Sequence, residues 1–166
     1  MPDRILQLRS VVAAGSATTK LDAIREAGAL LVSAGAVRAD YVDSMFDREA
    51  SVSTYMGNFL AIPHGTNDAR DSVIRSSLSL VRYAEPIDWN GQQVRFAIGI
   101  AGRGNEHLEI LQKLAVVFSD ADQVQRLIDA VTAEDIFMLL TGEEENDGPP
   151  SQLSEGAPAR KSRSGL

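Results

Sequence analysis

One histidine of this chain follows directly on a short apolar segment. Residues 59–62 read Phe-Leu-Ala-Ile, and Pro63, His64 and Gly65 come next. Proline ends a strand because it has no amide hydrogen to donate, and a loop held by a rigid strand is a common place for a reactive side chain. A neutral imidazole is nucleophilic near neutral pH. The pattern makes His64 a candidate nucleophile, with a structural or merely exposed histidine as the alternative.

The second of the two histidines, His107, follows another apolar segment and falls in the first turn of a predicted helix. Ligands of open α/β sheets gather at strand ends beside helix N-termini, whose unpaired amides bind anions. His107 is therefore a candidate for contact with a negatively charged group. A capping or surface histidine is the alternative.

Arg48, near the end of a predicted helix, is the third candidate. Its planar guanidinium would match the oxygens of a phosphoryl group in pairs. It could instead pair with Asp47 or Glu49, or complement the partial negative charge at the helix C-terminus. Both roles stay open at this point.

No motif indicates a cofactor or a metal. The chain has no nucleophile elbow, no Walker loop and no dinucleotide-binding glycine motif after a strand. A metal site of His64, His107 and either Glu106 or Glu109 is conceivable, but no short ligand spacing supports it. We therefore predict neither a cofactor nor a bound metal.

The elements that must position these residues alternate between extended and helical patterns. Strands are predicted at residues 5–12, 59–62, 77–83 and 94–101, the last in the buried middle of a sheet with residues 94, 96, 98 and 100 on one face. Helices are predicted from the N-cap Thr19 to Gly35, from the N-cap Asp40 through Glu49, and from Asn105, Asp120 and Thr132, the last ending at Gly142.

Two of these helices have apolar positions that recur on one face. We expect the buried positions of the first helix to be Leu21, Ile24, Ala27 and Leu31, and those of the helix that begins at Asn105 to be Leu108, Leu111, Ala115 and Phe118. Such faces can cover the two sides of a central sheet.

Helices before and after the strands predict an α/β fold, with a mixed β-sheet layered between helices in a single domain over residues 1–142. Residues 143–166 contain three consecutive glutamates, two consecutive prolines and only two large apolar residues. Such a segment buries too little surface to offset its ordering entropy, so we predict a disordered acidic, Pro/Ser-rich tail.

The composition limits the classes of partner and the cellular compartment that we expect for this protein. A net charge of −7 argues against nucleic acid or an anionic membrane as the main partner. The longest mostly apolar run, residues 27–37, is too short to cross a bilayer, and the N-terminus has no signal-peptide pattern. The absence of cysteine excludes disulfides and thiolate chemistry. We expect a cytoplasmic protein without direct membrane insertion.

Residues 57–65 resemble a known phosphorylation-site signature. It belongs to the enzyme IIA components of the mannitol/fructose class of the sugar phosphotransferase system. That signature is a glycine, two variable residues, an aliphatic residue, alanine, another aliphatic residue, and then proline, histidine and glycine, and this chain matches every fixed position. The resemblance extends from the first strand to Leu140, and Asn105, Glu106 and His107 are most similar to the mannitol-specific branch.

The resemblance implies a phosphotransferase/anion-transport-like fold and a phosphocarrier function. His64 would take a phosphoryl group from the phosphocarrier protein HPr and pass it to a cysteine of a IIB domain, for uptake of mannitol or a related sugar. His107 would orient the phosphoryl group and Arg48 would stabilise its charge. Because the 166 residues hold no cysteine and no membrane span, the IIB partner, alone or in a IIC–IIB permease, is expected to be a separate chain.

Two other functions are considered. A regulatory, nitrogen-related IIA component would control other proteins through its phosphorylation state. A metal-dependent hydrolase that uses the two histidines is the alternative from a different class.

Overall fold

A computed structural model describes residues 5–103 and 106–142, without the side chains of Glu106, His107 and Ile110. The predicted tail at 143–166 lies outside the described residues, so that prediction and the domain boundary stay predictions. In chain order the elements are β1 (Leu6–Val12), α1 (Lys20–Ser33), α2 (Tyr41–Ser51), β2 (Tyr55–Gly57), β3 (Leu60–Ala61), the 3-10 helix η1 (Asn67–Ser72), β4 (Ser77–Trp89), β5 (Gln92–Ala101), α3 (Glu106–Phe118), α4 (Ala121–Asp129) and α5 (Ala133–Thr141).

The five strands form one mixed sheet in the order β1-β4-β5-β3-β2. Strand β4 pairs parallel with β1 and antiparallel with β5, while β3 pairs parallel with β5 and antiparallel with β2. The long β4–β5 hairpin turns at Asn90 and Gly91, both with positive φ, as a tight two-residue turn requires. The predicted α/β class, mixed sheet and central β5 are confirmed.

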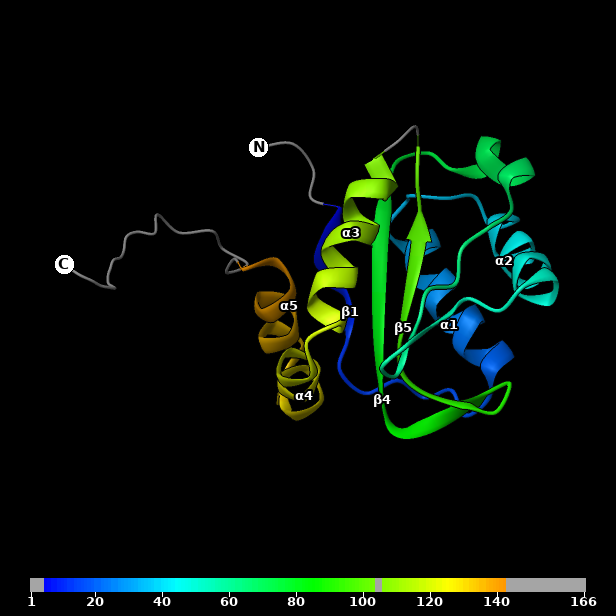
Figure 1. The fold of residues 1–166 in the computed structure, drawn as a ribbon. Coiled ribbons are helices and arrows are strands. Elements are labelled where there is room, and N and C mark those ends of the chain that lie inside the picture. The colour runs from blue at the N-terminus through cyan, green and yellow to red at the C-terminus, as the bar shows by residue number, and fades with distance from the viewer. Residues whose placement is uncertain (1–4, 104–105, 143–166) are drawn as a thin grey trace, which may run out of the picture.

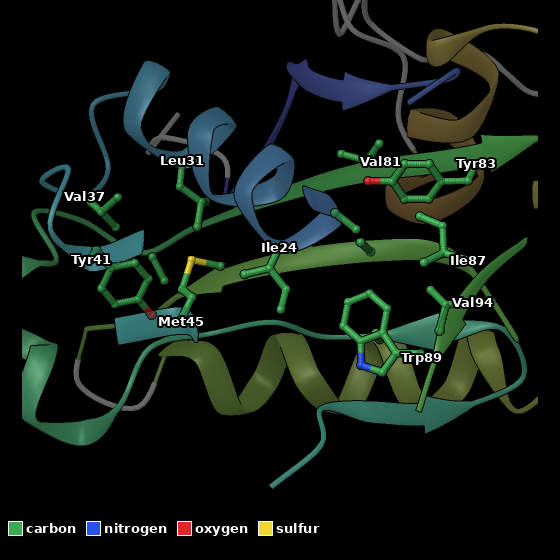
Figure 2. Packing of buried hydrophobic residues seen from close by; sticks show 14 of the residues in the cluster. Ile24, Leu31, Val37, Tyr41, Met45, Val81, Tyr83, Ile87, Trp89 and Val94 are labelled. Atoms are coloured by element: carbon green, nitrogen blue, oxygen red, sulfur yellow. The ribbon is translucent and has the colours of Figure 1, made fainter. Parts of the chain in front are cut away.

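Helices cover both faces of the sheet. Figure 1 shows α1 and α2 on one side and α3, α4 and α5 on the other. The α1/α2 side contains a buried cluster that includes Ile24, Met45 and Trp89, part of which Figure 2 shows. The opposite side is built around Phe96, whose ring meets that of Phe118 edge to face at 5.5 Å between centroids. Residues 96–101 of β5 are all buried, which matches their unbroken run of apolar residues and glycine.

Strand β5 departs from the predicted alternation at one point. Val94 packs in the cluster on the α1/α2 side, whereas Phe96, Ile98 and Ile100 pack on the other side. The amides of Arg95 and Phe96 both donate to the carbonyl of Phe59, at 2.9 and 3.0 Å. Two successive amides that share one acceptor make a bulge, and a bulge reverses the side that the preceding residue faces. The prediction for Val94 is therefore wrong.

Helix α1 begins and ends where the sequence predicts. The Thr19 side chain accepts a hydrogen bond from the Asp22 amide at 3.2 Å, and Gly35 has a φ of +73° just beyond the helix. Ile24 and Leu31 are buried, but Leu21 is 53% exposed, so its predicted burial is wrong. At 100° per residue, Leu21 lies about 90° from the centre of the buried stripe.

Helix α2 starts after Asp40 as predicted, but the Asp40 side chain does not cap it. Its carboxylate instead accepts a hydrogen bond from the Ser72 hydroxyl at 2.7 Å. This contact ties the start of α2 to the end of η1. The predicted capping role of Asp40 is therefore wrong, because a partner 32 residues further along the chain binds the carboxylate.

The predicted inner face of α3 is rotated from the observed one. Leu114 and Phe118 are buried, whereas Leu108 is 49% exposed and Ala115 is also exposed. Leu108 and Ala115 each lie about 90° from the centre of the stripe that Leu114 and Phe118 define. The predicted start at Asn105 lies outside the described residues.

The last two helices agree with their sequence signals. The Asp120 carboxylate accepts from the amides of Asp122 and Gln123, and Thr132 accepts from the amide of Asp135. Gly142 ends α5 in the left-handed conformation. In the described part of the chain, no helix is both long enough and apolar enough to span a membrane.

Candidate active site

His64 lies where the parallel pair of β3 and β5 ends. It forms a single parallel bridge with Ile100, and the Ile100 amide donates to the carbonyl of Pro63 at 3.0 Å. Strand β3 ends at Ala61, and Pro63, which has no amide hydrogen, pairs with β5 only through its carbonyl. The central strand of the sheet therefore holds the backbone immediately before His64.

A hydrogen bond to the local backbone orients the imidazole of His64. Its Nδ1 lies 2.8 Å from the carbonyl oxygen of Ile62. A carbonyl oxygen only accepts, so Nδ1 carries the hydrogen, and in the neutral ring the lone pair is then on Nε2. The side chain is half-buried, and it lines a cavity. The hydrogen bond therefore fixes the tautomer of the neutral ring, with Nδ1 protonated.

Gly65 is required by a close approach to Tyr41. Its φ is not in the left-handed region, but a Cβ at this position would lie 2.5 Å from Tyr41 Cε1 and would also collide with Ser44 Oγ. The Gly65 amide donates to the Tyr41 hydroxyl at 2.9 Å, and that hydroxyl donates to the carbonyl of Ile100 at 2.8 Å. Burial raises the pKa of Tyr41 although the Gly65 bond opposes the shift, so the hydroxyl stays protonated.

His64 and Tyr41 line a cavity of about 410 Å³. Its wall continues through η1, which contributes the exposed side chain of Arg70, and through the first turns of α3, where Leu108 and Leu111 lie. The cavity thus combines an imidazole, a cation and apolar side chains. Such a site can receive an anionic group and exclude part of its water.

The structure places Arg48 at the end of α2, where its Nη1 donates to the carbonyl of Val52 at 2.6 Å. This contact matches the helix-terminus role that the sequence left open, and Arg48 is not among the side chains that line the cavity. Glu49 does not pair with Arg48; its buried carboxylate accepts from the amide and hydroxyl of Thr54 and from Trp89 Nε1. A role of Arg48 in charge stabilisation stays a prediction.

His107 is the second residue of α3, and its side chain lies outside the described residues. Its role in orienting a phosphoryl group stays a prediction. The helix itself reaches the cavity, because Leu108 follows His107 directly and lines the cavity wall. Among the side chains that the structure describes, which exclude those of Glu106 and His107, no three from histidine, cysteine, aspartate or glutamate are placed to hold a metal ion.

Sequence reasoning missed two residues of this site. The sequence pattern does not single out Tyr41, although a buried tyrosine hydroxyl needs hydrogen-bond partners. Arg70 belongs to a polar segment after His64 with no pattern that singles it out. Only the position of η1 brings it to the cavity wall.

This chain is similar to known proteins in a family model, in sequence and in structure. Residues 4–142 match the family model described as the phosphoenolpyruvate-dependent sugar phosphotransferase system, EIIA 2. The mannitol-specific phosphotransferase enzyme IIA component of Halalkalibacterium halodurans is 46% identical over 140 residues, which cover 84% of this chain and 97% of that protein.

Solved structures support the same relationship. The complex of enzyme IIA for mannitol with phosphorylated enzyme IIB from Escherichia coli matches with a TM-score of 0.75 and 34% identity, over 81% of this chain and 96% of that chain. The nitrogen regulatory protein IIA-Ntr from Neisseria meningitidis matches with a TM-score of 0.71 and 30% identity, over 82% of this chain and 97% of that chain.

Proposed function

This chain belongs to the EIIA 2 family of the phosphoenolpyruvate-dependent sugar phosphotransferase system, and from this premise we propose that it is a phosphocarrier for the uptake of mannitol or a related sugar. His64 accepts a phosphoryl group from phospho-HPr and passes it to a cysteine of a IIB chain. The observation that carries the proposal is the bond from His64 Nδ1 to the Ile62 carbonyl, which leaves the lone pair on Nε2, at the wall of the cavity.

The transfer requires one nucleophile and little other covalent chemistry. The Nε2 lone pair of His64 attacks phosphorus, the bond from phosphorus to the donor atom of HPr breaks, and its electron pair stays on the donor. The ring now carries positive charge, because Nδ1 keeps its hydrogen. The Ile62 carbonyl accepts a charge-assisted hydrogen bond from that nitrogen and stabilises the phosphorylated form.

The second step reverses the roles. The IIB thiolate attacks phosphorus, the bond from phosphorus to Nε2 breaks, and the electron pair returns to the imidazole of His64. Because Nδ1 is still protonated, the leaving group is a neutral ring rather than an anion, which makes its departure easy. Arg48, His107 and the cation of Arg70 are the candidates for stabilising the charge in transit.

The partners follow from the family and from the surface. The Escherichia coli enzyme IIA for mannitol has been solved in complex with phosphorylated enzyme IIB, and a similar encounter is proposed for this chain. The exposed apolar side chain of Leu108 lines the His64 cavity, and the exposed Ile74 follows Val73, which also lines it. A net charge of −7 would speed the approach of partners with basic patches without requiring a stable complex.

A regulatory function is the second candidate, because IIA-Ntr shares the fold at 30% identity. The higher identity of 46% to a mannitol-specific relative favours transport. Transfer of the phosphoryl group to a purified mannitol IIB domain separates the two functions. A chain that accepts the group from HPr but donates none to IIB would be regulatory.

The deciding experiment is incubation with phosphoenolpyruvate, enzyme I and HPr, followed by intact-mass measurement. We expect one acid-labile phosphoryl group on the wild-type chain and none on His64→Ala. Unchanged labelling of His64→Ala would refute the proposal. His107→Ala should still accept the group but pass it on more slowly, and a normal rate of onward transfer would remove His107 from the site.

A further inference from the structure

We propose that Tyr41 is a positioning residue for His64: its hydroxyl links the Gly65 amide to the Ile100 carbonyl at the last backbone rung between the His64 segment and β5. The inference rests on the proposed function, because the position that it explains is that of the phosphoryl-accepting nitrogen. It adds a residue from α2, which sequence and motif do not connect with the chemistry.

The register of the sheet defines what the last rung should be. In a regular parallel ladder, a residue bridged to Ile100 is flanked by two bonds: the Ile100 amide donates to the residue before, and the residue after donates to the Ile100 carbonyl. The first bond is present, from the Ile100 amide to the Pro63 carbonyl at 3.0 Å. The Tyr41 hydroxyl lies at the position of the second bond. It accepts a hydrogen bond from the Gly65 amide and donates one to the Ile100 carbonyl.

The result is a closed ring of hydrogen bonds around His64. The Pro63 carbonyl is bound to the Ile100 amide, the Ile100 carbonyl to the Tyr41 hydroxyl, and that hydroxyl to the Gly65 amide. The backbone from Pro63 to Gly65 closes the ring. The backbone on each side of His64 is therefore held, on one side by a main-chain amide and on the other by a side-chain hydroxyl. Tyr41, Gly65 and Ile100 also line the cavity, so this ring lies at its wall.

Tyr41 is itself held too firmly to be a mobile contact. Its side chain is 4% exposed, and its ring lies against Gly65 so closely that no Cβ would fit between them. The Ser44 hydroxyl donates to the Tyr41 carbonyl at 2.6 Å, and the neighbouring Asp40 is bound to Ser72. Because Tyr41 is buried, it would act on His64 without touching the partner protein.

The test compares Tyr41→Phe with Tyr83→Phe. Tyr83 is the matched control: it is also buried, it also loses a hydrogen-bonded hydroxyl, and Figure 2 shows it at the opposite end of the same cluster. With phospho-HPr as donor, we expect Tyr41→Phe to lower kcat about tenfold and to leave KM for HPr within about twofold, because the nucleophile is misplaced while the docking surface is unchanged. Tyr83→Phe should keep both constants.

A second readout does not depend on phosphoryl transfer. Nitrogen-15 NMR of the His64 ring in the full chain reports which nitrogen carries the hydrogen. We expect the Nδ1–H form in the wild type and in Tyr83→Phe, and a mixture of both forms in Tyr41→Phe. If the wild type accepted no phosphoryl group, the proposed function would fail, and this spectrum alone would still decide whether Tyr41 positions His64.

A wild-type kcat with a wild-type His64 spectrum in Tyr41→Phe would overturn the proposal, as would an equal slowing in Tyr83→Phe. Urea unfolding of each variant shows whether it is folded during the assay. Should Tyr41→Phe not fold, p-fluorophenylalanine at this position fills the space of the hydroxyl without donating a hydrogen bond. Slowed transfer with that residue supports the proposal, and normal transfer refutes it.

Discussion

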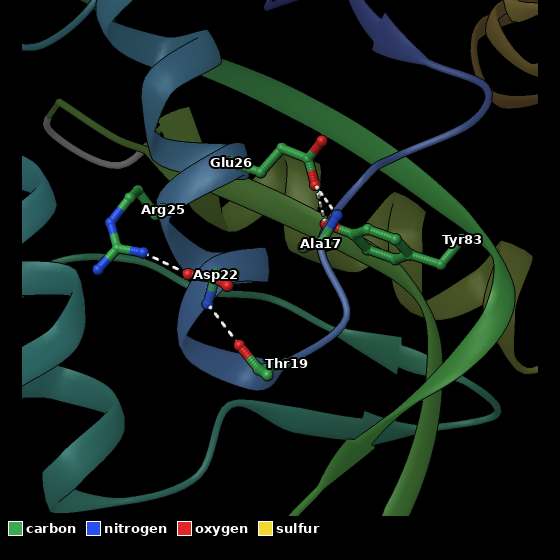
Figure 3. Close-up of polar contacts among 6 residues, drawn as sticks. All are labelled: Ala17, Thr19, Asp22, Arg25, Glu26 and Tyr83. Atoms are coloured by element: carbon green, nitrogen blue, oxygen red, sulfur yellow. Dashed lines mark hydrogen bonds and ion pairs between the residues drawn. The ribbon is translucent and has the colours of Figure 1, made fainter.

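Two tyrosine hydroxyls at opposite ends of one apolar cluster organise the polar groups of this protein in different ways. At one end, Tyr83 donates to Glu26 at 2.8 Å, and the amides of Ser16 and Ala17 donate to the same carboxylate. Figure 3 shows the contacts of Glu26 with Tyr83 and Ala17. At the other end, Tyr41 connects Gly65 to Ile100 beside a cavity. The first group joins a loop to a helix, and the second borders a site.

The chemical state of each group reflects this difference. Burial would raise the pKa of Glu26, but hydrogen bonds from Ser16, Tyr83 and Ala17 outweigh it and lower the pKa below its ordinary value. Its charge is compensated inside the protein. Around His64, the fixed hydrogen bonds hold the backbone and Nδ1, and the imidazole lines the cavity. A polar network beside a cavity therefore points to function, whereas one that only joins a loop to a helix points to stability.

The sharpest test of the comparison changes the glycine beside His64. In Gly65→Ala the new Cβ would meet the Tyr41 ring at 2.5 Å, so His64 or Tyr41 must move. We expect phosphoryl uptake from phospho-HPr to fall about 100-fold, since a displacement of about 1 Å can cost that much. Rapid-quench labelling measures the rate.

Gly91→Ala is the control for that change. It lies in the β4–β5 turn with a φ of +92° and has open space around it. We expect a stability cost of about 1–2 kcal/mol from the left-handed backbone and no change in uptake. Normal uptake in Gly65→Ala would mean that phosphoryl transfer tolerates a displaced His64. It would remove the distinction between the Tyr41 and Tyr83 groups.

Substitutions of Arg48 test whether a residue of α2 beyond Tyr41 contributes to phosphoryl transfer. If its guanidinium reaches the phosphoryl group during transfer, Arg48→Ala should slow uptake and onward transfer about tenfold, and Arg48→Lys should restore only part of the rate because the paired donors are lost. Stopped-flow transfer from HPr and to IIB measures both steps. Equal rates in all three proteins would leave Arg48 with only its contact to Val52.

Substitutions in the group formed by Tyr83 and Glu26 should change the stability of the fold alone. Glu26→Gln keeps the size of the side chain but removes the charge that accepts from Ser16, Ala17 and Tyr83. We expect a loss of about 1 kcal/mol in the free energy of unfolding, measured in urea, because the site is only partly buried. Phosphoryl uptake should be unchanged, and slowed uptake would contradict the separation of the two networks.

The same residue predicts a small pH effect. A carboxylate whose pKa is lower in the folded than in the unfolded chain stabilises the fold above the unfolded pKa of about 4.3. This stabilisation is lost as the pH falls through the lower folded value. The stability difference between the wild type and Glu26→Gln should therefore shrink from pH 7 towards pH 3. A constant difference would show that the charge of Glu26 contributes nothing.

Sequence patterns predicted the features that depend on near neighbours. Thr19, Asp120 and Thr132 cap helices through amides two or three residues away, so residue type and spacing are sufficient. The strand predicted at 59–62 is equally local, although the structure limits it to Leu60–Ala61. The candidate role of His64 followed from these local signals together with the family signature.

Other features depend on partners far along the chain. Asp40 resembles an N-cap, but Ser72 binds it. The buried face of α3 is set by Phe96 of β5, which meets Phe118, and a pattern of apolar residues within the helix could not give that rotation. The bulge at Arg95 depends in the same way on the carbonyl of Phe59.

The sequence by itself determined the family, the α/β class and the candidate nucleophile, because each of these depends on residue types at short spacing. Only the tertiary structure decided which nitrogen of His64 is bound to the backbone, that Arg70 rather than Arg48 lines the cavity, and that Tyr41 lies beside His64. The partners of the Tyr41 hydroxyl, Gly65 and Ile100, lie 24 and 59 residues away. A hydroxyl acquires such partners only when the strands and helices have packed.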